Sequence, residues 1–281
     1  MTQTSAPCPV CGGTATEPFT VQRGYAWERC GGCGLLALRP QPSRQELARA
    51  YRDYLPRDPG GVQDWQCLMA DVFREALARL EPARRPGGRL LDVGCAYGFF
   101  VEQARAAGWD ARGIDLSEHA VAAARSRGLP VERVALEEAD FPAEGFDAVT
   151  LFYVLEHVPD PADTVRRVFR WLRPGGQLLL RVPHTAPLVS VLGALGVRNE
   201  LLDPPYHLWD FSPATLRALL EGAGFTRVEI FPGASTRPAG APNLALTKAA
   251  GGLAQALHAA SRGRWLLPGV SKTTVARRPA G

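Results

Sequence analysis

Four cysteines near the start of the chain are the first residues whose types and spacing predict chemistry. They form two Cys-x-x-Cys pairs, Cys8/Cys11 and Cys30/Cys33, with 18 residues between the pairs. At this spacing two short loops can present four thiolates tetrahedrally to one Zn²⁺ ion, and the glycine after each pair allows the tight turn that such loops need. Because four protein ligands leave no open coordination position, the sequence predicts a structural zinc ribbon.

Two disulfides or a redox-active dithiol are the alternative interpretations of these pairs. Disulfides fit poorly with the first seven residues, which lack the basic and apolar pattern of a secretory signal. A redox Cys-x-x-Cys is expected to open a helix in a βαβ unit, and neither pair does so. About 35 residues bury too little apolar surface to fold alone, so we favour zinc, which would supply the missing folding energy.

A glycine-rich turn forms a second candidate site. Between residues 90 and 100 an apolar segment around Asp92 leads into the sequence GCAYG and an aromatic pair, which predicts a strand, a tight turn and a helix start. Asp115, 21 residues after Gly94, is placed to accept hydrogen bonds from both hydroxyls of a ribose. The third glycine of a dinucleotide fingerprint is absent, so another ribose-bearing cofactor is favoured.

Three histidines in the second half of the chain are candidates for a general base, because imidazole titrates near neutral pH. His157 follows a predicted strand, where a structural role at a helix start is the alternative. His184 closes another predicted strand, and His207 lies in a loop rich in aromatic residues. An ordinary loop histidine stacked on Trp209 is the alternative for His207. The hydroxyl of Tyr153 is a further candidate.

The N-terminal part needs few elements to position the cysteines. Hydrophobic patterning predicts short strands at 19–21 and 25–29, an extended segment at 35–42, and helices at 43–54 and 64–80 with a linker at 56–61. The apolar stripe of the second helix is most simply explained as packing on a sheet. A cover over a cofactor is the alternative.

Strands and helices then alternate with short connections. Strands are expected at 89–93, 110–115, 130–133, 146–152 and 177–182, and helices at 99–107, 117–127 and 160–171. This alternation predicts an α/β fold with a doubly wound, mostly parallel sheet, in which ligands bind beyond the carboxyl ends of the strands.

The C-terminal part adds a helix at 212–223 and strands at 225–231 and 272–277. We expect three units: a zinc ribbon at 1–42, a helical linker or lid at 43–85, and a cofactor-binding domain at 86–281. The apolar segment within 184–211 and the Gly, Ala and Pro-rich insertion at 232–269 are expected to form lids over an acceptor site. The helix predicted at 244–260 has packing or dimer formation as its alternative role.

Composition narrows the classes of partner. Of 281 residues 46% are hydrophobic, and the formal charge is +4, with basic residues scattered along the chain. Scattered charge does not favour a nucleic-acid binder, and no run approaches the roughly 20 apolar residues of a membrane span. A cytoplasmic location is expected.

Five stretches of the chain resemble the motifs of the class I S-adenosylmethionine-dependent methyltransferases, in the same order and spacing. They are 91–98 (LDVGCAYG), 113–117 (GIDLS), 145–149 (GFDAV), 152–161 (FYVLEHVPDP) and 172–180 (LRPGGQLLL). The resemblance covers residue 64 to the end and implies a seven-stranded, Rossmann-like sheet. A ribbon followed by a segment like 35–42 also recurs in a subset of these enzymes, often in natural-product or cell-envelope biosynthesis.

The resemblance also implies roles for individual residues. The cofactor S-adenosylmethionine would contact ten of them: Asp92, Gly94, Ala96, Gly98, Asp115, Leu116, Leu136, Glu137, Phe152 and Tyr153. The turn at 94–98 would lie under its methionine part, Asp115 would hold the ribose, and the aromatic pair would lie beneath the sulfonium. Family members usually carry an acidic residue just before residue 136, where this chain has Ala135.

These observations favour a methyltransferase that acts on a small molecule, of secondary-metabolite or sugar type, with the help of a general base. An RNA or protein methyltransferase that uses the ribbon for recognition is one alternative. A non-catalytic cofactor-binding scaffold is another. The sequence does not decide the oligomeric state, for which a homodimer is one candidate.

Overall fold

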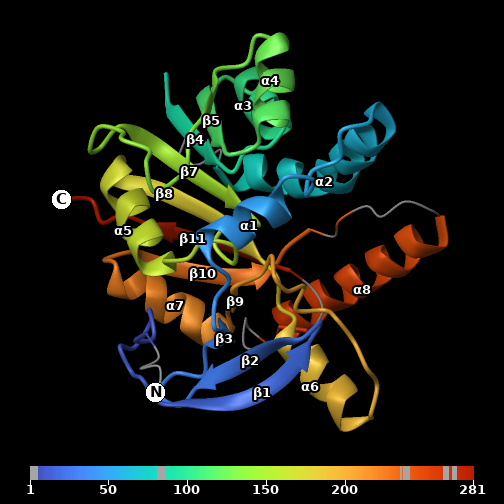
Figure 1. Cartoon of the computed structure of the whole chain (residues 1–281). Coiled ribbons are helices and arrows are strands. Elements are labelled where there is room, and N and C mark those ends of the chain that lie inside the picture. The colour runs from blue at the N-terminus through green and yellow to red at the C-terminus, as the bar shows by residue number, and fades with distance from the viewer. Residues whose placement is uncertain (1–5, 81–86, 235, 237–240, 262–265, 268–270) are drawn as a thin grey trace.

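Seven strands of the computed structural model form one sheet, with the order β10-β11-β8-β7-β4-β5-β6 (Figure 1). The model describes residues 6–80, 87–234, 236, 241–261, 266–267 and 271–281. The strands are β4 (Arg89–Val93), β5 (Asp110–Asp115), β6 (Val131–Arg133), β7 (Phe146–Phe152), β8 (Leu172–Val182), β10 (Thr226–Pro232) and β11 (Lys272–Arg277). Strands β4 to β8 pair in parallel, and β11 runs antiparallel to β8 and β10. The mostly parallel, seven-stranded fold is therefore confirmed.

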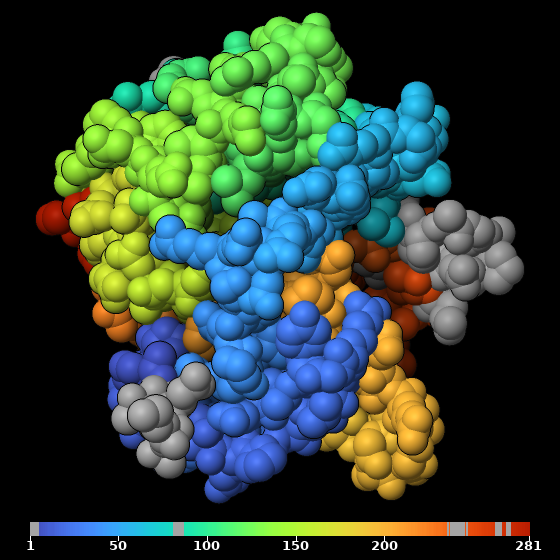
Figure 2. All heavy atoms as spheres, viewed as in Figure 1, coloured from blue at the N-terminus to red at the C-terminus, as the bar shows by residue number. Residues whose placement is uncertain are grey.

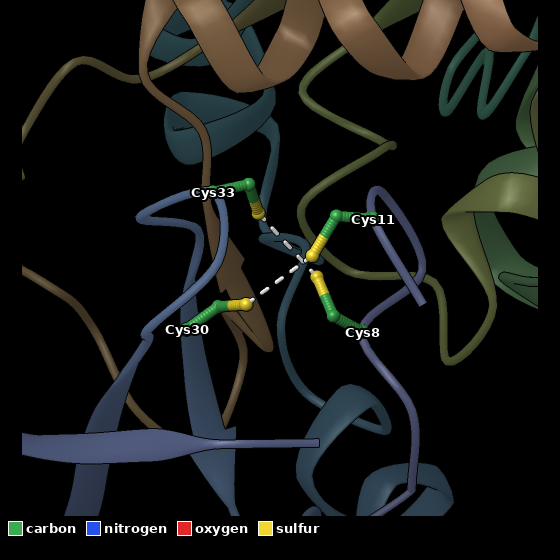
Figure 3. Close-up of side chains that lie close together, drawn as sticks. All are labelled: Cys8, Cys11, Cys30 and Cys33. Carbon is green, nitrogen blue, oxygen red and sulfur yellow. Dashed lines mark hydrogen bonds between the residues drawn. The ribbon is translucent and has the colours of Figure 1, made fainter. Parts of the chain in front are cut away.

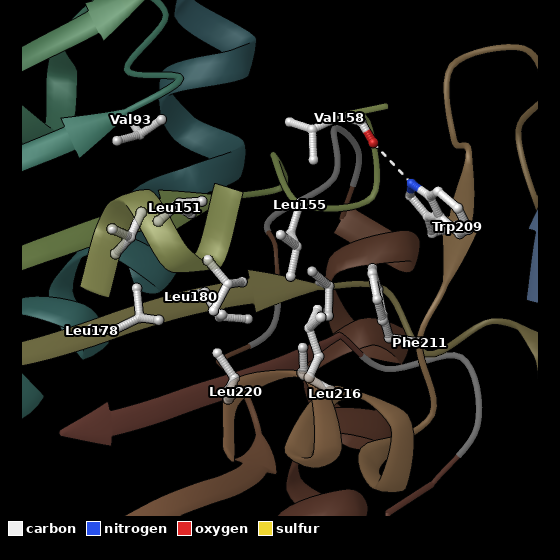
Figure 4. Close-up of a cluster of buried hydrophobic side chains, with 14 of the residues drawn as sticks. Val93, Leu151, Leu155, Val158, Leu178, Leu180, Trp209, Phe211, Leu216 and Leu220 are labelled. Carbon is white, nitrogen blue, oxygen red and sulfur yellow. Dashed lines mark hydrogen bonds between the residues drawn. The ribbon is translucent and has the colours of Figure 1, made fainter. Parts of the chain in front are cut away.

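Helices cover both faces of this sheet, as the alternation of elements predicts. One face carries α2 (Pro59–Leu80), α3 (Phe99–Ala106) and α4 (Glu118–Ser126), whose buried side chains, Phe73 and Phe100 among them, form one apolar cluster. The other face carries α5 (Pro161–Trp171) and α7 (Pro213–Gly222), and its cluster includes Leu180 and Leu216 (Figure 4). Helix α8 (Ala241–Ala260) packs beside β10.

Three helices begin at the polar residues that the sequence suggests as caps. Ser117, Asp160 and Ser212 each accept a hydrogen bond from the main-chain N–H three residues later, and a proline occupies the first turn of α5 and of α7. The caps determine where each helix starts, and therefore which residues remain in the loops at the carboxyl edge of the sheet.

The ribbon is a four-stranded antiparallel sheet that includes a strand from far along the chain. Strands β1 (Thr16–Gln22), β2 (Tyr25–Cys30) and β3 (Leu36–Arg39) come from the N-terminus, and β9 (Trp209–Asp210) pairs with β3. The main-chain N–H of Leu38 also donates to the carbonyl of Leu208 at 2.9 Å. The sequence predicts the three N-terminal segments but not the fourth strand, because two residues carry no periodicity that a pattern can detect.

The apolar core of the ribbon is continuous with that of the main sheet. Trp27 and Leu38 belong to the same cluster as Leu180 of β8. Trp209 lies in this core, and its Nε1 donates to the carbonyl of Val158 at 2.8 Å (Figure 4). The ribbon therefore packs directly on the main sheet.

Helix α1 (Arg44–Tyr51) and the residues after it cross one face of the molecule, from the ribbon to the start of α2 (Figure 2). The helix expected at 43–54 thus ends earlier, and the one expected at 64–80 begins earlier, at Pro59. Asp58 Oδ1 accepts a hydrogen bond from the N–H of Gly61 at 2.8 Å. The Asp-Pro pair therefore caps the helix, and most of the predicted linker at 56–61 is ordered by this cap.

Two further expectations concern the ends of elements. The fifth parallel strand, β8, begins at Leu172 instead of 177, because Leu172 pairs with Phe146 before a break in the register. The segment 184–211 contains α6 (Ala186–Ala194) and β9. The insertion at 232–269 contains α8, while its residues 235, 237–240, 262–265 and 268–270 and the boundary expected at 85/86 lie outside the described residues. Within the described ranges, none of the helices has the length and hydropathy that crossing a bilayer requires.

Candidate functional site

The four ribbon cysteines converge from two loops on a common centre (Figure 3). The Sγ atoms of Cys8 and Cys33 are 3.6 Å apart, and those of Cys11 and Cys30 are 3.5 Å apart. Four sulfurs around a tetrahedral Zn²⁺ at about 2.3 Å are separated by about 3.7 Å, so the donor set fits this ion. Burial raises the pKa of Cys33, and the neighbouring Cys8 and Cys11 thiols add to the rise.

The glycine-rich turn lies at the carboxyl end of β4. Gly94, Ala96 and Gly98 all have positive φ, of 71°, 47° and 71°. A side chain at Gly94 would place its Cβ 2.4 Å from Val154 Cγ2, and one at Gly113 would place its Cβ 2.6 Å from Cys95 Sγ. The turn is therefore packed tightly against its neighbouring strands.

Asp115 closes β5 beside this turn. Its Oδ2 accepts a hydrogen bond from the N–H of Ala96 and its Oδ1 one from the N–H of Ser117, both at 2.8 Å. Burial raises the pKa of Asp115, and these main-chain donors oppose the rise. A carboxylate has about four acceptor sites, so two remain for hydroxyl groups of a ligand.

Asp92 is fully buried one residue before the end of β4. Its Oδ1 accepts a hydrogen bond from Thr150 Oγ1 at 2.7 Å. Burial raises the pKa of Asp92 to about 8, so that the carboxyl is mostly protonated at neutral pH. A ligand that brings a positive charge close to this group would favour its ionised form.

The remaining predicted cofactor residues lie along the same edge of the sheet. Leu116 is 64% exposed, Leu136 is buried, and Glu137 is half-buried. Phe152 packs its ring against Phe100 at a centroid distance of 4.8 Å, as part of the cluster under α2 and α3. The structure thus brings the ends of β4, β5 and β7 and the loop after β6 together.

A pocket of about 670 Å³ opens beside the turn. Its lining includes Tyr97, His119 and Arg127, together with Arg57 from the connection before α2 and Gln66 from α2 itself. The hydroxyl of Tyr97 donates to the main-chain carbonyl of Pro56. The connection between α1 and α2 is therefore held against the turn, where it forms an outer wall of the site.

Tyr153 follows β7 with a positive φ of 56°. Its hydroxyl accepts a hydrogen bond from Arg181 Nε at 2.7 Å and donates one to Ser271 Oγ at 2.9 Å. Arg181 is itself buried, and its Nη1 donates to Thr273 Oγ1 at 3.1 Å. The Tyr153 hydroxyl is thus held between β8 and the segment before β11.

His157 lies in a cluster of rings from three segments of the chain. Its Nδ1 is 2.9 Å from the carbonyl oxygen of Tyr206 and 2.6 Å from the hydroxyl of Tyr51, and its ring centroid is 4.8 Å from that of His207. Since a carbonyl oxygen only accepts, these contacts favour the tautomer with its proton on Nδ1. Burial lowers the pKa of His157 to about 3 and that of His207 to about 4, so both rings are neutral. His207 therefore contacts His157, and the stacking on Trp209 considered from the sequence is replaced by this contact.

His184 stands apart from this pair of histidines, at the end of β8. It is 6% exposed, and its Nδ1 has no hydrogen-bond partner among the described residues. Burial and the charge of Lys272 lower its pKa to about 3. Of the three histidines proposed as bases, the structure thus brings two together.

The match to a protein-family model decides which family this arrangement represents. Residues 65–230, more than half of the chain, match the model described as a methyltransferase domain. The chain belongs to the methyltransferase-domain family. This match confirms the resemblance that the five sequence motifs indicate.

Known proteins resemble this methyltransferase domain either in sequence or in fold. It is 39% identical over 158 residues to a ubiquinone biosynthesis O-methyltransferase of Xanthomonas axonopodis pv. citri, covering 52% of this chain and 65% of the relative, less than two thirds of its length. Solved structures that share the fold include the [4+2]-cyclase SpnF, with a TM-score of 0.59 and 21% identity, covering 86% of this chain and 98% of that one. A SAM-dependent methyltransferase from Archaeoglobus fulgidus has a TM-score of 0.54 and 17% identity, covering 78% of this chain and 100% of that one.

Several polar residues of the methyltransferase domain escape prediction from the sequence. Thr150 lies within a fully buried strand and would be read as core, yet its hydroxyl is the partner of Asp92. Tyr51 lies 106 residues before the histidine that it contacts. Glu156 stands inside one of the recognised motifs, which is a signal for a role, but its neighbours become visible only in three dimensions.

Proposed function

We propose that the protein transfers a methyl group from S-adenosylmethionine to a small-molecule acceptor. The observation that carries this proposal is the tight turn at 94–98 beside Asp115, whose carboxylate keeps free acceptor sites at the carboxyl edge of the sheet. The cofactor supplies an activated methyl group on its sulfonium. Residues 92, 94, 96, 98, 115, 116, 136, 137, 152 and 153 would hold it, as the resemblance implies.

An acceptor with a hydroxyl group agrees best with the relatives. The curated relative from Xanthomonas is named for O-methylation in ubiquinone biosynthesis. We extend this to the present chain as O-methylation of a phenol or of a sugar-type or secondary-metabolite hydroxyl. In that reaction the acceptor O–H bond breaks, its oxygen forms the new bond to the methyl carbon, and the bond from carbon to sulfur breaks.

The protein must then place the acceptor and accept its proton. His157, His184, His207 and Tyr153 are the candidates for this role. Burial keeps the three imidazoles neutral, and therefore able to accept a proton, but it also disfavours the imidazolium that would result. Proton removal by a histidine alone would thus be a weak source of catalysis here.

The four cysteines complete the proposal as a structural zinc site. Their distances match a tetrahedral ion and leave it no open position, so this ion would stabilise the ribbon and take no part in methyl transfer.

Cofactor binding tests the proposal through Asp115→Asn, with Asp110→Asn as the matched control at the exposed start of the same strand. We expect isothermal titration to show S-adenosylmethionine binding to the wild-type protein. Asp115→Asn should weaken it roughly 10- to 100-fold, since hydrogen bonds to a charged group contribute about 1.5–3 kcal/mol each. Asp110→Asn should bind as the wild type does. Equal affinity for all three proteins would contradict this role of Asp115.

Methyl transfer to a panel of catechols, phenols and sugars then tests the acceptor class. Transfer to a small molecule supports the proposal. Transfer only to RNA or protein would favour the ribbon as a recognition module, and cofactor binding without any transfer would favour a scaffold.

A further inference from the structure

Three metal-ligating side chains meet at the carboxyl edge of the sheet, well outside the cysteine ribbon in the sequence. Glu156 and His157 follow β7, and His207 precedes β9. One ligand atom from each residue lies within 4.8 Å of the other two. Two imidazoles and one carboxylate are a donor set that binds divalent transition metals and leaves coordination positions open.

Both imidazoles are oriented as they are in metal-bound histidines. His157 donates from Nδ1 to the carbonyl of Tyr206, and the main chain of Leu202 interacts with the ring of His207 and raises its pKa against the effect of burial. In metal sites such bonds to main-chain carbonyls fix the tautomer and leave the other nitrogen with its lone pair for the ion. The two rings thus each keep one nitrogen able to bind a metal.

The carboxylate of Glu156 interacts with the charge of Lys272 but lacks the hydrogen bonds that a buried acid normally has. Its side chain is completely buried, and neither Oε1 nor Oε2 has a hydrogen-bond partner among the described residues. The nearby Lys272 directs its Nζ to the carbonyl of Pro183. Buried carboxyl oxygens without a hydrogen bond are costly and rare in folded proteins, so both oxygens are open to a partner beyond the described residues.

We propose that Glu156, His157 and His207 form a binding site for one divalent transition-metal ion, such as Mn²⁺, Fe²⁺ or Zn²⁺. The ion would bind one or both Glu156 oxygens and the free nitrogen of each ring. Bonds of about 2.0–2.2 Å require ligand atoms closer than the apo distances, so the site contracts by roughly 1 Å when it loads.

The surroundings of the ion give it a role in the proposed reaction. The rings of Tyr51, Tyr54 and Tyr206 surround His157, with centroid distances of 5.8 Å from Tyr51 and from Tyr54, and Tyr54 reaches the surface. Tyr51 among them contacts Nδ1 of His157, the ring nitrogen that faces away from the proposed ion. The role of the ion rests on the proposed function: Glu156, His157 and His207 would hold it, and it would supply the Lewis acidity that lowers the pKa of an acceptor hydroxyl, whose proton would leave to water.

Titration with Mn²⁺, followed by electron paramagnetic resonance, tests the site without cofactor or acceptor. Mn²⁺ prefers oxygen and nitrogen donors, so the cysteine site, loaded with zinc, does not compete for it. We expect one Mn²⁺ per wild-type chain, and at least a tenfold weaker affinity in Glu156→Gln and in His207→Gln. Glu118→Gln and His258→Gln, which change an acid on α4 and a histidine on α8, should bind as the wild type does.

Thermal unfolding gives a second, independent readout. Mn²⁺ should raise the unfolding temperature of the wild type and leave that of Glu156→Gln unchanged. The proposal is overturned if the wild-type protein binds no Mn²⁺ or if the variants bind it with wild-type affinity. If one variant fails to fold, the Mn²⁺ affinity of the other variant tests the site.

The same variants separate this proposal from the proposed function. Affinity for S-adenosylmethionine should be equal in the wild type and Glu156→Gln, since the ion lies on the acceptor side. A wild-type protein that does not bind S-adenosylmethionine would refute the proposed function, whereas the measured affinity for Mn²⁺ would still test the metal site. Unchanged methyl transfer in a Glu156→Gln protein that binds no Mn²⁺ would refute the role of the ion in activating the acceptor.

Discussion

Replacement of Asp92 by Asn is expected to remove a pH-dependent loss of stability. Burial raises the pKa of this carboxyl from 3.8 to about 8 in the folded protein, whereas in the unfolded chain it ionises near its ordinary value. Between these two values the folded state therefore holds one proton more than the unfolded state. The free energy of unfolding then falls by about 1.4 kcal/mol for each pH unit across that window, or about 4 kcal/mol from pH 4 to pH 7.

Urea unfolding of the wild type and Asp92→Asn at pH 5, 6 and 7, without cofactor, measures this effect. Asn does not ionise, so the stability of the variant relative to the wild type should increase with pH at about 1.4 kcal/mol per unit. The unpaired amide hydrogens of Asn cost about 1–3 kcal/mol at every pH and leave the slope unchanged. Asp110→Asn, an exposed acid on the neighbouring strand β5, serves as the control, and its curve should parallel that of the wild type. A parallel curve for Asp92→Asn would refute the assignment of a proton to Asp92.

Three other substitutions test separate parts of the structure. Cys11→Ser should abolish tight zinc binding and lower the unfolding temperature. The loss of binding is measured as loss of the thiolate-to-cobalt absorption in Co²⁺-substituted protein. An unchanged spectrum would exclude the four-thiolate site. Gly94→Ala should weaken S-adenosylmethionine binding at least tenfold, because the new Cβ would lie 2.4 Å from Val154 Cγ2 and residue 94 has a φ of 71°. Adding Val154→Ala should recover part of the loss. Wild-type affinity in the single variant would contradict this packing. Trp209→Phe should cost about 1–3 kcal/mol in urea unfolding, because the carbonyl of Val158 loses its buried donor; an unchanged midpoint would show that this bond adds nothing.

Local signals predict most of the cofactor edge. The turn at 94–98, the acid that ends β5 and the caps of the helices each depend on residues within a few positions of one another. The Asp-Pro pair at 58–59, like the pair at 160–161, places an aspartate at the helix cap and a proline at the first helical position. It starts α2 despite the two glycines that follow. A cap therefore outweighs the poor helix propensity of Gly60 and Gly61, which the expectation of a linker had weighted too strongly.

The acceptor side depends on contacts between distant parts of the chain, and patterns in the sequence do not reveal these. Tyr51 contacts His157 across 106 residues, and Gln22 contacts Asn199 across 177. Such pairs leave no periodicity, since each partner is read as part of its own helix, strand or loop. Glu156 shows the same limit, because its lack of hydrogen bonds is a property of its surroundings.

The strand β9 connects the cysteine ribbon to the loop that carries His207, so ligand binding at one can be coupled to ligand binding at the other. The loop that carries His207 is bound to the ribbon through the pairing of β9 with β3 and through Arg23, whose guanidinium lies 2.7 Å from Glu200 and 3.2 Å from Asp203. Where a ligand that orders this loop raises the affinity of the cysteines for zinc, zinc raises the affinity for that ligand by the same factor. Zinc supply would thereby set how readily the distant site fills, although no thiolate touches it.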